Sequence, residues 1–216
     1  MNEQLLTLHH PLFEAKVLKQ GAQLIHFQAK GKEPLFWSAK LETFEKGKAF
    51  RGGIPLCWPW FNKAGTPSHG FARIMDWELT HKKESSEGIE LVFELKSSVK
   101  TLVLWPYAFH AKVLMKLGQS VEVSLHAKAD KESTGALHTY FRCKDVQKVS
   151  AFGLGTVYTD SLQNGKLCHS KDEALHVRKN VDRIYTQPEA QTLLCEGENT
   201  LSISHEGHSD VVVWNP

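Results

Sequence analysis

The sequence predicts an all-β protein made of antiparallel sheets, and three features of the chain support this fold class. Apolar and polar residues alternate over several short stretches, which is the spacing of strands that bury one face. Turn residues, mainly glycine and asparagine, separate these stretches. The chain contains no long amphipathic helix with capping residues. Many short strands joined by turns are typical of a β-sandwich or barrel.

The alternation can be followed along the chain. It is imperfect over residues 13–18 and clean over residues 89–95 and 121–128. The residues expected to face the core there are Phe13, Ala15, Val17, Ile89, Leu91, Phe93, Leu95, Val121, Val123, Leu125 and Ala127. Turns are expected at Glu87-Gly88, Leu117-Gly118-Gln119, Gln163-Asn164-Gly165 and Glu206-Gly207. Because no repeat or low-complexity linker divides the chain, we expect a single domain over residues 1–216.

Composition restricts the class of protein. The chain has 216 residues, of which 41% are hydrophobic and 23% charged, as in a soluble globular protein with a sizeable core. The formal net charge is +2 and no Lys/Arg-rich block occurs, which argues against a nucleic-acid partner. No stretch has the length and apolar character of a signal peptide or membrane span, so we expect a cytoplasmic protein without membrane contact.

The cysteines give no sign of a metal site or a disulfide framework. Cys57, Cys143, Cys168 and Cys195 are far apart and lack paired metal-ligand spacing. This distribution favours reduced thiols, as in a cytoplasmic protein.

The segment from Arg51 to Arg73 is the first candidate site. It combines two arginines, His69 and several large aromatic residues with many glycines and prolines. Glycine allows close approach of the backbone to a ligand, and the planar arginine fork matches a phosphate or carboxylate. We interpret the segment as an anion-binding loop. The alternatives are structural ion pairs for the arginines and core packing for Trp58 and Trp60.

The second candidate is the strand-like segment Ala136–Phe141. If it is extended, His138 and Tyr140 face the same side, so that an imidazole and a phenol share one surface. Histidine is suited to proton transfer near neutral pH, and a phenol can orient a hydroxylated ligand. The alternative is that His138 has no catalytic role, as is common for a lone strand histidine among the 12 histidines of the chain.

The third candidate is Asp182, in the segment Asn180–Tyr185. Its carboxylate could accept hydrogen bonds from sugar hydroxyls. Neighbouring Asp and Arg side chains before an apolar residue are also found in an ordinary turn or strand start.

Five short motifs follow one another along nearly the whole chain. They are Arg51-Gly52-Gly53-Ile54-Pro55, His69-Gly70-Phe71-Ala72-Arg73, Leu137-His138-Thr139-Tyr140-Phe141, Val181-Asp182-Arg183-Ile184-Tyr185 and Val213-Trp214-Asn215-Pro216. In this order and with compatible gaps they resemble the hexose-6-phosphate mutarotases, the glucose-6-phosphate 1-epimerase branch of the aldose 1-epimerase superfamily.

The resemblance implies a galactose mutarotase-like β-sandwich with its site in a cleft on one sheet. It implies interconversion of the α and β anomers of a hexose 6-phosphate, glucose 6-phosphate above all, without metal or organic cofactor. His138 would protonate the ring oxygen, and Arg51 and Arg73 would hold the phosphate, with His69 close by. Asp182 would accept sugar hydroxyls and Tyr140 would line the pocket. The expected partner is a small-molecule sugar phosphate, and a monomer is expected.

The chain departs from the family pattern at its C-terminus. Relatives continue past the Trp-Asn-Pro motif, and the glutamate that takes the anomeric proton lies in that later segment. This sequence stops at Pro216, and Glu196 and Glu198 precede the motif. We expect a sequence that lacks its C-terminal segment, with the full-length gene product as the enzyme and the fragment weak or inactive. The alternative is a natural short form that has lost its base and a piece of its sheet.

Two other classes of function stay open. A non-catalytic sugar-phosphate-binding module would keep Arg51, Arg73 and Asp182 and would not need the glutamate. A metal-dependent β-sandwich enzyme could use His205 and His208, but no neighbouring carboxylate and histidine set completes such a site.

Overall fold

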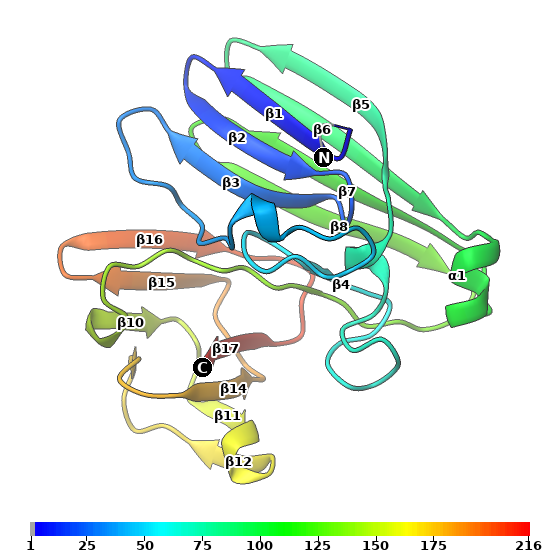
Figure 1. The fold of residues 1–216 in the computed structure, drawn as a ribbon. Helices are drawn as coiled ribbons and strands as arrows, with labels where there is room; N and C mark the ends of the chain where they lie inside the picture. The colour runs from blue at the N-terminus through cyan, green and yellow to red at the C-terminus, as the bar shows by residue number, and fades with distance from the viewer. Residues whose placement is uncertain (1–2) are drawn as a thin grey trace. The chain divides into compact units, whose positions relative to one another are not determined.

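The computed structural model describes residues 3–216, and its regular structure is almost entirely antiparallel β-strand, as predicted (Figure 1). The chain divides into two compact units, Met1–Arg142 and Cys143–Pro216, and each is described by itself. The expected single domain therefore stays a prediction. Among residues 3–216, no helix has the length and apolar character needed to cross a membrane.

Among residues 3–142, the first unit contains nine strands and three short helices. The strands are β1 (Leu5–His10), β2 (Phe13–Leu18), β3 (Gln23–Ala29), β4 (Leu56–Cys57), β5 (Glu78–Ser85), β6 (Gly88–Lys96), β7 (Phe109–Leu117), β8 (Val121–Ala129) and β9 (Ala136–Leu137). The helices are η1 (Leu41–Thr43), η2 (Ala72–Ile74) and α1 (Val99–Leu104). The sheets have the orders β1-β2-β3, β5-β6-β7-β8 and β4-β9. In Figure 1 the blue sheet β1–β3 lies beside the green sheet β5–β8.

The core of this unit lies between its two larger sheets. Alternate side chains of β2, β6 and β7 are buried, and they join one apolar cluster that also includes Leu24 of β3 and Trp58. The predicted core faces at residues 13–18 and 89–95 are therefore confirmed. In β8, by contrast, Val121, Val123 and Leu125 are only partly buried and Ala127 is exposed. This strand is at the edge of its sheet, where a neighbouring strand covers it on one side only.

Helix α1 is short, and the alternation of apolar and polar residues in the sequence did not predict it. It begins after Ser98, whose hydroxyl accepts from the Thr101 backbone N–H while the Thr101 side chain accepts from the Ser98 backbone N–H. At six residues it is too short to produce a detectable amphipathic repeat.

The second unit contains eight strands and two 3₁₀ helices. The strands are β10 (Val149–Phe152), β11 (Val157–Asp160), β12 (Lys166–His169), β13 (Leu175–His176), β14 (Val181–Tyr185), β15 (Gln191–Glu196), β16 (Asn199–Ser204) and β17 (Val211–Asn215). The helices are η3 (Val146–Lys148) and η4 (Ser161–Gln163). The sheets have the orders β13-β10-β15-β16 and β12-β11-β14-β17, and they share their own apolar cluster around Tyr158 and Tyr185.

The predicted turns lie between strands. Asn164 and Gly165 both have left-handed backbones, with φ of 55° and 75°, and they connect η4 to β12. These are the conformations that an Asn-Gly pair adopts without much strain.

Candidate active site

Three extended segments of the first unit meet at one point, where Trp37, Gly53 and Tyr140 form a closed triangle of backbone hydrogen bonds. The Trp37 N–H donates to the Tyr140 carbonyl (2.9 Å), and the Tyr140 N–H donates to the Gly53 carbonyl (2.8 Å). The Gly53 N–H closes the cycle by donating to the Trp37 carbonyl (2.8 Å). The triangle joins the segment before η1, the start of the Arg51–Arg73 segment, and the segment after β9.

The two glycines after Arg51 make this meeting possible. Gly53 has a φ of +60°, and a Cβ on it would lie 2.1 Å from the Leu24 carbonyl oxygen. Gly52 has a φ of +114°, and a Cβ there would lie 2.2 Å from the Ser38 Cα. Both are buried, so the close approach that glycine permits here is to protein backbone, whereas we had expected an approach to a ligand.

His138 and Tyr140 follow β9, on backbone that continues its pairing with the Arg51–Arg73 segment. The His138 N–H donates to the Pro55 carbonyl (2.9 Å). The two rings stack, with centroids 4.8 Å apart and an interplanar angle of 22°, and both residues are half-buried. They share one surface, as alternation along an extended segment predicts, although the strand itself ends at Leu137.

His69 approaches the same surface from the loop before η2. Its backbone is left-handed (φ 62°), and its N–H donates to the Asn62 carbonyl (2.7 Å). The Asn62 N–H donates in return to Nδ1 of the His69 ring (3.2 Å). Because Nδ1 accepts this bond, the neutral ring carries its proton on Nε2. Burial lowers the pKa of His69, and the charges of Arg73 and His138 lower it further, which favours this neutral form.

The aromatic rings around these residues form a continuous row, which we call the ring row. It runs Phe61, His69, His138, Tyr140, Trp37. Successive ring centroids are 5.1, 6.1, 4.8 and 5.8 Å apart. Such contacts fix the orientation of each ring relative to the next.

The two predicted arginines lie beside this row. Arg73, in η2, is half-buried; one terminal nitrogen donates to the Ser68 carbonyl (2.7 Å), and its buried Nε has no hydrogen-bond partner among residues 3–216. Arg51 is exposed, and its carbonyl accepts from the Ala39 N–H (3.0 Å). Within the described chain neither arginine forms a salt bridge, so the alternative of a structural ion pair has no support for either.

Electrostatics connect the arginines to His138. Burial lowers the pKa of His138, partly opposed by a hydrogen bond to its own backbone, and the positive charges of Arg73 and Arg51 lower it further. Arg51, His69, Arg73, His138 and Tyr140, which are separated by up to 89 positions in the sequence, are thus brought into one region of the first unit. Cationic arginines with no acidic partner beside a neutral imidazole are suited to binding an anion.

Asp182 belongs to the second unit. It lies in β14, half-buried, opposite Trp214 of β17. The neighbouring Arg183 is occupied structurally, since its Nε is 3.5 Å from the Asp160 carboxylate and its guanidinium lies 4.3 Å from the centre of the Tyr158 ring. A role for Asp182 at the site stays a prediction.

The tryptophans of the Arg51–Arg73 segment pack in or against the core. Trp58 is 2% exposed and donates from its indole to the Ser133 hydroxyl (3.2 Å). The Trp60 indole donates to the Pro67 carbonyl (2.8 Å) and packs against the same apolar cluster. The structure therefore favours core packing, the alternative given above for both tryptophans.

No group of three or more His, Cys, Asp and Glu side chains suited to a metal ion occurs among residues 3–216. The rings of His205 and His208 are 4.3 Å apart, and the His205 Nε2 is 3.0 Å from the Thr192 hydroxyl. All four cysteines are free thiols.

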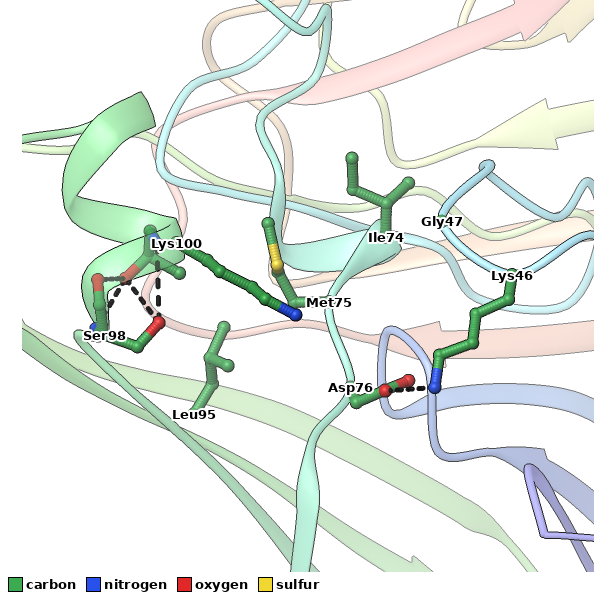
Figure 2. Close-up of a pocket in the computed structure, with 9 residues that line it drawn as sticks. Lys46, Gly47, Ile74, Met75, Asp76, Leu95, Ser98 and Lys100 are labelled. Carbon is green, nitrogen blue, oxygen red and sulfur yellow. Dashed lines mark hydrogen bonds and ion pairs between the residues drawn. The ribbon is translucent and has the colours of Figure 1, made fainter.

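A separate pocket of about 440 Å³ lies in the first unit and contains none of the predicted site residues. Figure 2 shows Lys100 extending from α1 towards Met75, and an ion pair between Lys46 Nζ and Asp76 (2.8 Å). Both members of this pair are exposed to solvent, so the pocket is open at this side.

Two residues of the site were not indicated by the sequence. Asn62 orients the His69 ring, and Trp37 ends the ring row. Neither belongs to one of the motifs. Asn62 reaches the His69 ring within a single loop, whereas Trp37 meets Tyr140 through long-range pairing. An isolated tryptophan beside a serine, as in Trp37-Ser38, gives no signal of a site.

Comparisons with known proteins agree with the fold and the motifs. The sequence profile of the family described as aldose 1-epimerase matches residues 4–216. The chain is 36% identical over 217 residues to a Salmonella typhimurium protein named "Putative glucose-6-phosphate 1-epimerase", and 35% identical over 217 residues to an Escherichia coli protein of that name. Each alignment covers 98% of this chain and 74% of the relative.

Solved structures show the same architecture. A Salmonella typhimurium structure titled a putative mutarotase superposes with a TM-score of 0.95 at 37% identity, covering 98% of this chain and 74% of that one. A galactose mutarotase related enzyme from Lactobacillus acidophilus superposes with a TM-score of 0.75 at 18% identity, covering 97% and 80%. The fold is therefore galactose mutarotase-like, as the motifs implied.

Proposed function

The chain belongs to the aldose 1-epimerase family, and from this premise we propose that it takes part in interconverting the α and β anomers of a hexose 6-phosphate, with glucose 6-phosphate as the preferred substrate. Membership of the family supports the interconversion of sugar anomers in general. The preference for a phosphorylated sugar rests on one observation, that Arg51 and Arg73 lie near His138 without any salt bridge among residues 3–216. The names of the 35–36% identical relatives point to the same substrate.

In this proposal the arginines hold the phosphate. Arg73 offers a half-buried guanidinium whose Nε has no partner within the described chain, and Arg51 offers an exposed side chain at the start of a buried segment. Charge-assisted bonds from planar guanidinium groups match phosphate geometry, and an unphosphorylated sugar would leave the two positive charges uncompensated. The His69 Nε2–H provides a further donor nearby, since Nδ1 of that ring is already occupied.

The proposed reaction requires two proton transfers. His138 gives a proton to the ring oxygen while a base removes the proton from the anomeric hydroxyl, so that the C1–O5 bond breaks and the aldehyde forms. Rotation about C1–C2 exposes the other face of the carbonyl, and the reverse transfers close the ring as the other anomer. Asp182 is proposed to accept sugar hydroxyls and Tyr140 to form a wall beside His138. The resemblance assigns the base to a glutamate beyond the Trp-Asn-Pro motif, and no residue of this chain is proposed for that role.

An acid at His138 must be protonated, whereas burial and the two arginines favour its neutral form in the free protein. A bound phosphate dianion places negative charge beside those arginines and offsets their effect on the imidazole. We therefore expect saturating inorganic phosphate or glucose 6-phosphate to raise the pKa of His138, so that more imidazolium is present near neutral pH when substrate is held. A nuclear magnetic resonance titration of the His138 ring proton, with and without phosphate, measures this directly. An unchanged or lowered pKa would contradict the coupling.

The function itself is tested by anomer exchange. Exchange spectroscopy on glucose 6-phosphate should show α and β signals interconverting faster with the protein than in buffer, and faster than for glucose at equal concentration. Binding of glucose 6-phosphate without faster exchange would instead identify a sugar-phosphate-binding module. Activity that persists in the presence of a chelator would remove the metal-dependent alternative.

A further inference from the structure

The indole of Trp37 is unusually exposed for so large an apolar side chain. It is 47% exposed, whereas the preceding Phe36 is 5% exposed and belongs to the core. This alternation follows from the extended backbone, which pairs Phe36 with Phe141 and directs successive side chains to opposite faces. Single exposed apolar residues are common on protein surfaces, so exposure alone assigns no role to Trp37.

The surroundings of Trp37 distinguish it from an ordinary surface residue. It ends the ring row, with its ring 5.8 Å from that of Tyr140, which in turn stacks on His138. On the C-terminal side of Trp37 the chain pairs with the start of the Arg51–Arg73 segment. Ser38 bridges to Gly52, and the Ala39 N–H donates to the Arg51 carbonyl. Trp37 therefore lies between the backbone that carries Arg51 and the rings that include His138.

The position of Trp37 is also fixed before any ligand binds. Its N–H and carbonyl are both used in the hydrogen-bonded triangle with Tyr140 and Gly53. Because the backbone is held at both groups and the ring contacts Tyr140, little conformational entropy remains to be lost on binding. A rigid, exposed aromatic surface of this kind is what binding sites use to obtain contact area at low entropic cost.

We propose that Trp37 is a substrate-binding residue of this site and that the face of its indole packs against the C–H groups of the hexose ring on the side of C6. The inference rests on the proposed function, since it takes hexose 6-phosphate as the ligand. Because the Arg51 backbone pairs with the extended segment that carries Trp37, a phosphate held by Arg51 would bring C5 and C6 of the sugar towards that segment. The C–H bonds of a sugar carry small positive partial charge, and the indole face is the negative part of its quadrupole. Trp37 would thus add affinity for the sugar and none for the phosphate alone.

Because Trp37 should contribute to binding of the sugar but not of the phosphate, the experiment compares the affinities for these two ligands. Dissociation constants for glucose 6-phosphate and for inorganic phosphate are measured by calorimetry on the wild type, Trp37→Ala and Trp37→Phe. We expect Trp37→Ala to weaken glucose 6-phosphate binding by about 5- to 15-fold, the equivalent of one good aromatic contact. Binding of inorganic phosphate should change by less than about 2-fold, and Trp37→Phe should recover most of the affinity for the sugar phosphate. The control is Phe152→Ala, which removes an aromatic of 36% exposure that is not part of the ring row and should leave both constants unchanged.

Each other outcome counts against the inference or against the function on which it rests. Equal affinity of wild type and Trp37→Ala for glucose 6-phosphate would overturn the stacking role. So would equal weakening of both ligands, because Trp37 would then act through the position of the arginines. A wild type that binds glucose 6-phosphate but does not accelerate anomer exchange would overturn the proposed enzyme and leave the binding role of Trp37 supported. Thermal unfolding of each variant shows whether a loss of affinity reflects a loss of folded protein.

Discussion

Replacement of His138 by alanine is expected to slow anomer exchange of glucose 6-phosphate by about 10² to 10⁴-fold, the usual contribution of one general acid. Affinity for the substrate should stay within several-fold, because the phosphate is bound by the arginines. His138 lies in the middle of the ring row and is half-buried, so its removal leaves a small gap beside Tyr140 with little effect on the core. Exchange spectroscopy gives the rate, and a titration followed by calorimetry gives the affinity.

Two further variants distinguish the loss of a proton donor from the loss of substrate binding. His138→Gln keeps a hydrogen-bonding side chain but cannot act as a general acid at neutral pH, so it should be nearly as slow as the alanine variant. Arg73→Ala should show the opposite pattern, with affinity reduced by about 10- to 100-fold through loss of a charge-assisted contact and a smaller change in the rate at saturation. A His138→Ala variant that retains its rate would show that another group supplies the proton.

Replacement of Gly53 by alanine is expected to lower the free energy of unfolding by about 3 kcal/mol or more, a large effect for one methyl group. The new Cβ would lie 2.1 Å from the Leu24 carbonyl oxygen, and the φ of +60° adds left-handed strain of about 1 kcal/mol. Leu24 is fully buried in β3 and its carbonyl accepts from the Ile54 N–H, so it cannot move without disturbing the core. The hydrogen-bonded triangle with Trp37 and Tyr140 would open, and the ring row would lose its alignment.

Gly31→Ala is the matched control. Gly31 has a similar φ of +73°, but a Cβ on it would have nothing within 4 Å. Gly31→Ala should therefore lower the free energy of unfolding only by the strain of a left-handed backbone, about 1 kcal/mol. Chemical unfolding of the wild type and of both variants gives the free energy of unfolding of each, and these values are compared. Equal losses of stability would mean that the contact with Leu24 is relieved by a small shift, and that the triangle does not depend on glycine at residue 53.

Much of the fold follows from local patterns. The alternation over residues 89–95 predicts β6 and its buried face, since a strand in the middle of a sheet shows its period of two most clearly. The same pattern over residues 121–128 predicts the strand β8 correctly but overstates its burial, because burial depends on whether a second strand lies alongside it. Local sequence does not contain that information.

The candidate site was predictable to a smaller extent. Alternation alone places His138 and Tyr140 on one face, and the stacked rings agree with it. The association of that pair with Arg51, His69 and Arg73 came only from the resemblance to a family, since nothing local connects residues so distant in the chain. Trp37 was missed for the same reason, because a long-range hydrogen bond and a ring contact bring it to Tyr140. Asn62 was missed because its bonds to His69 depend on the conformation of the loop between them, which residue types alone do not specify.

Local sequence patterns predict the class of fold, the positions of most strands and turns, and the chemical groups available for binding an anion and moving a proton. These depend on side-chain period, turn propensity and residue type, all of which are local. Only the tertiary structure decided that Gly52 and Gly53 serve the approach of one backbone to another, that Trp58 belongs to the core, and that Trp37 stands exposed beside the rings. The physical reason is that these roles depend on contacts between segments that are distant along the chain and meet only when the sheets have formed.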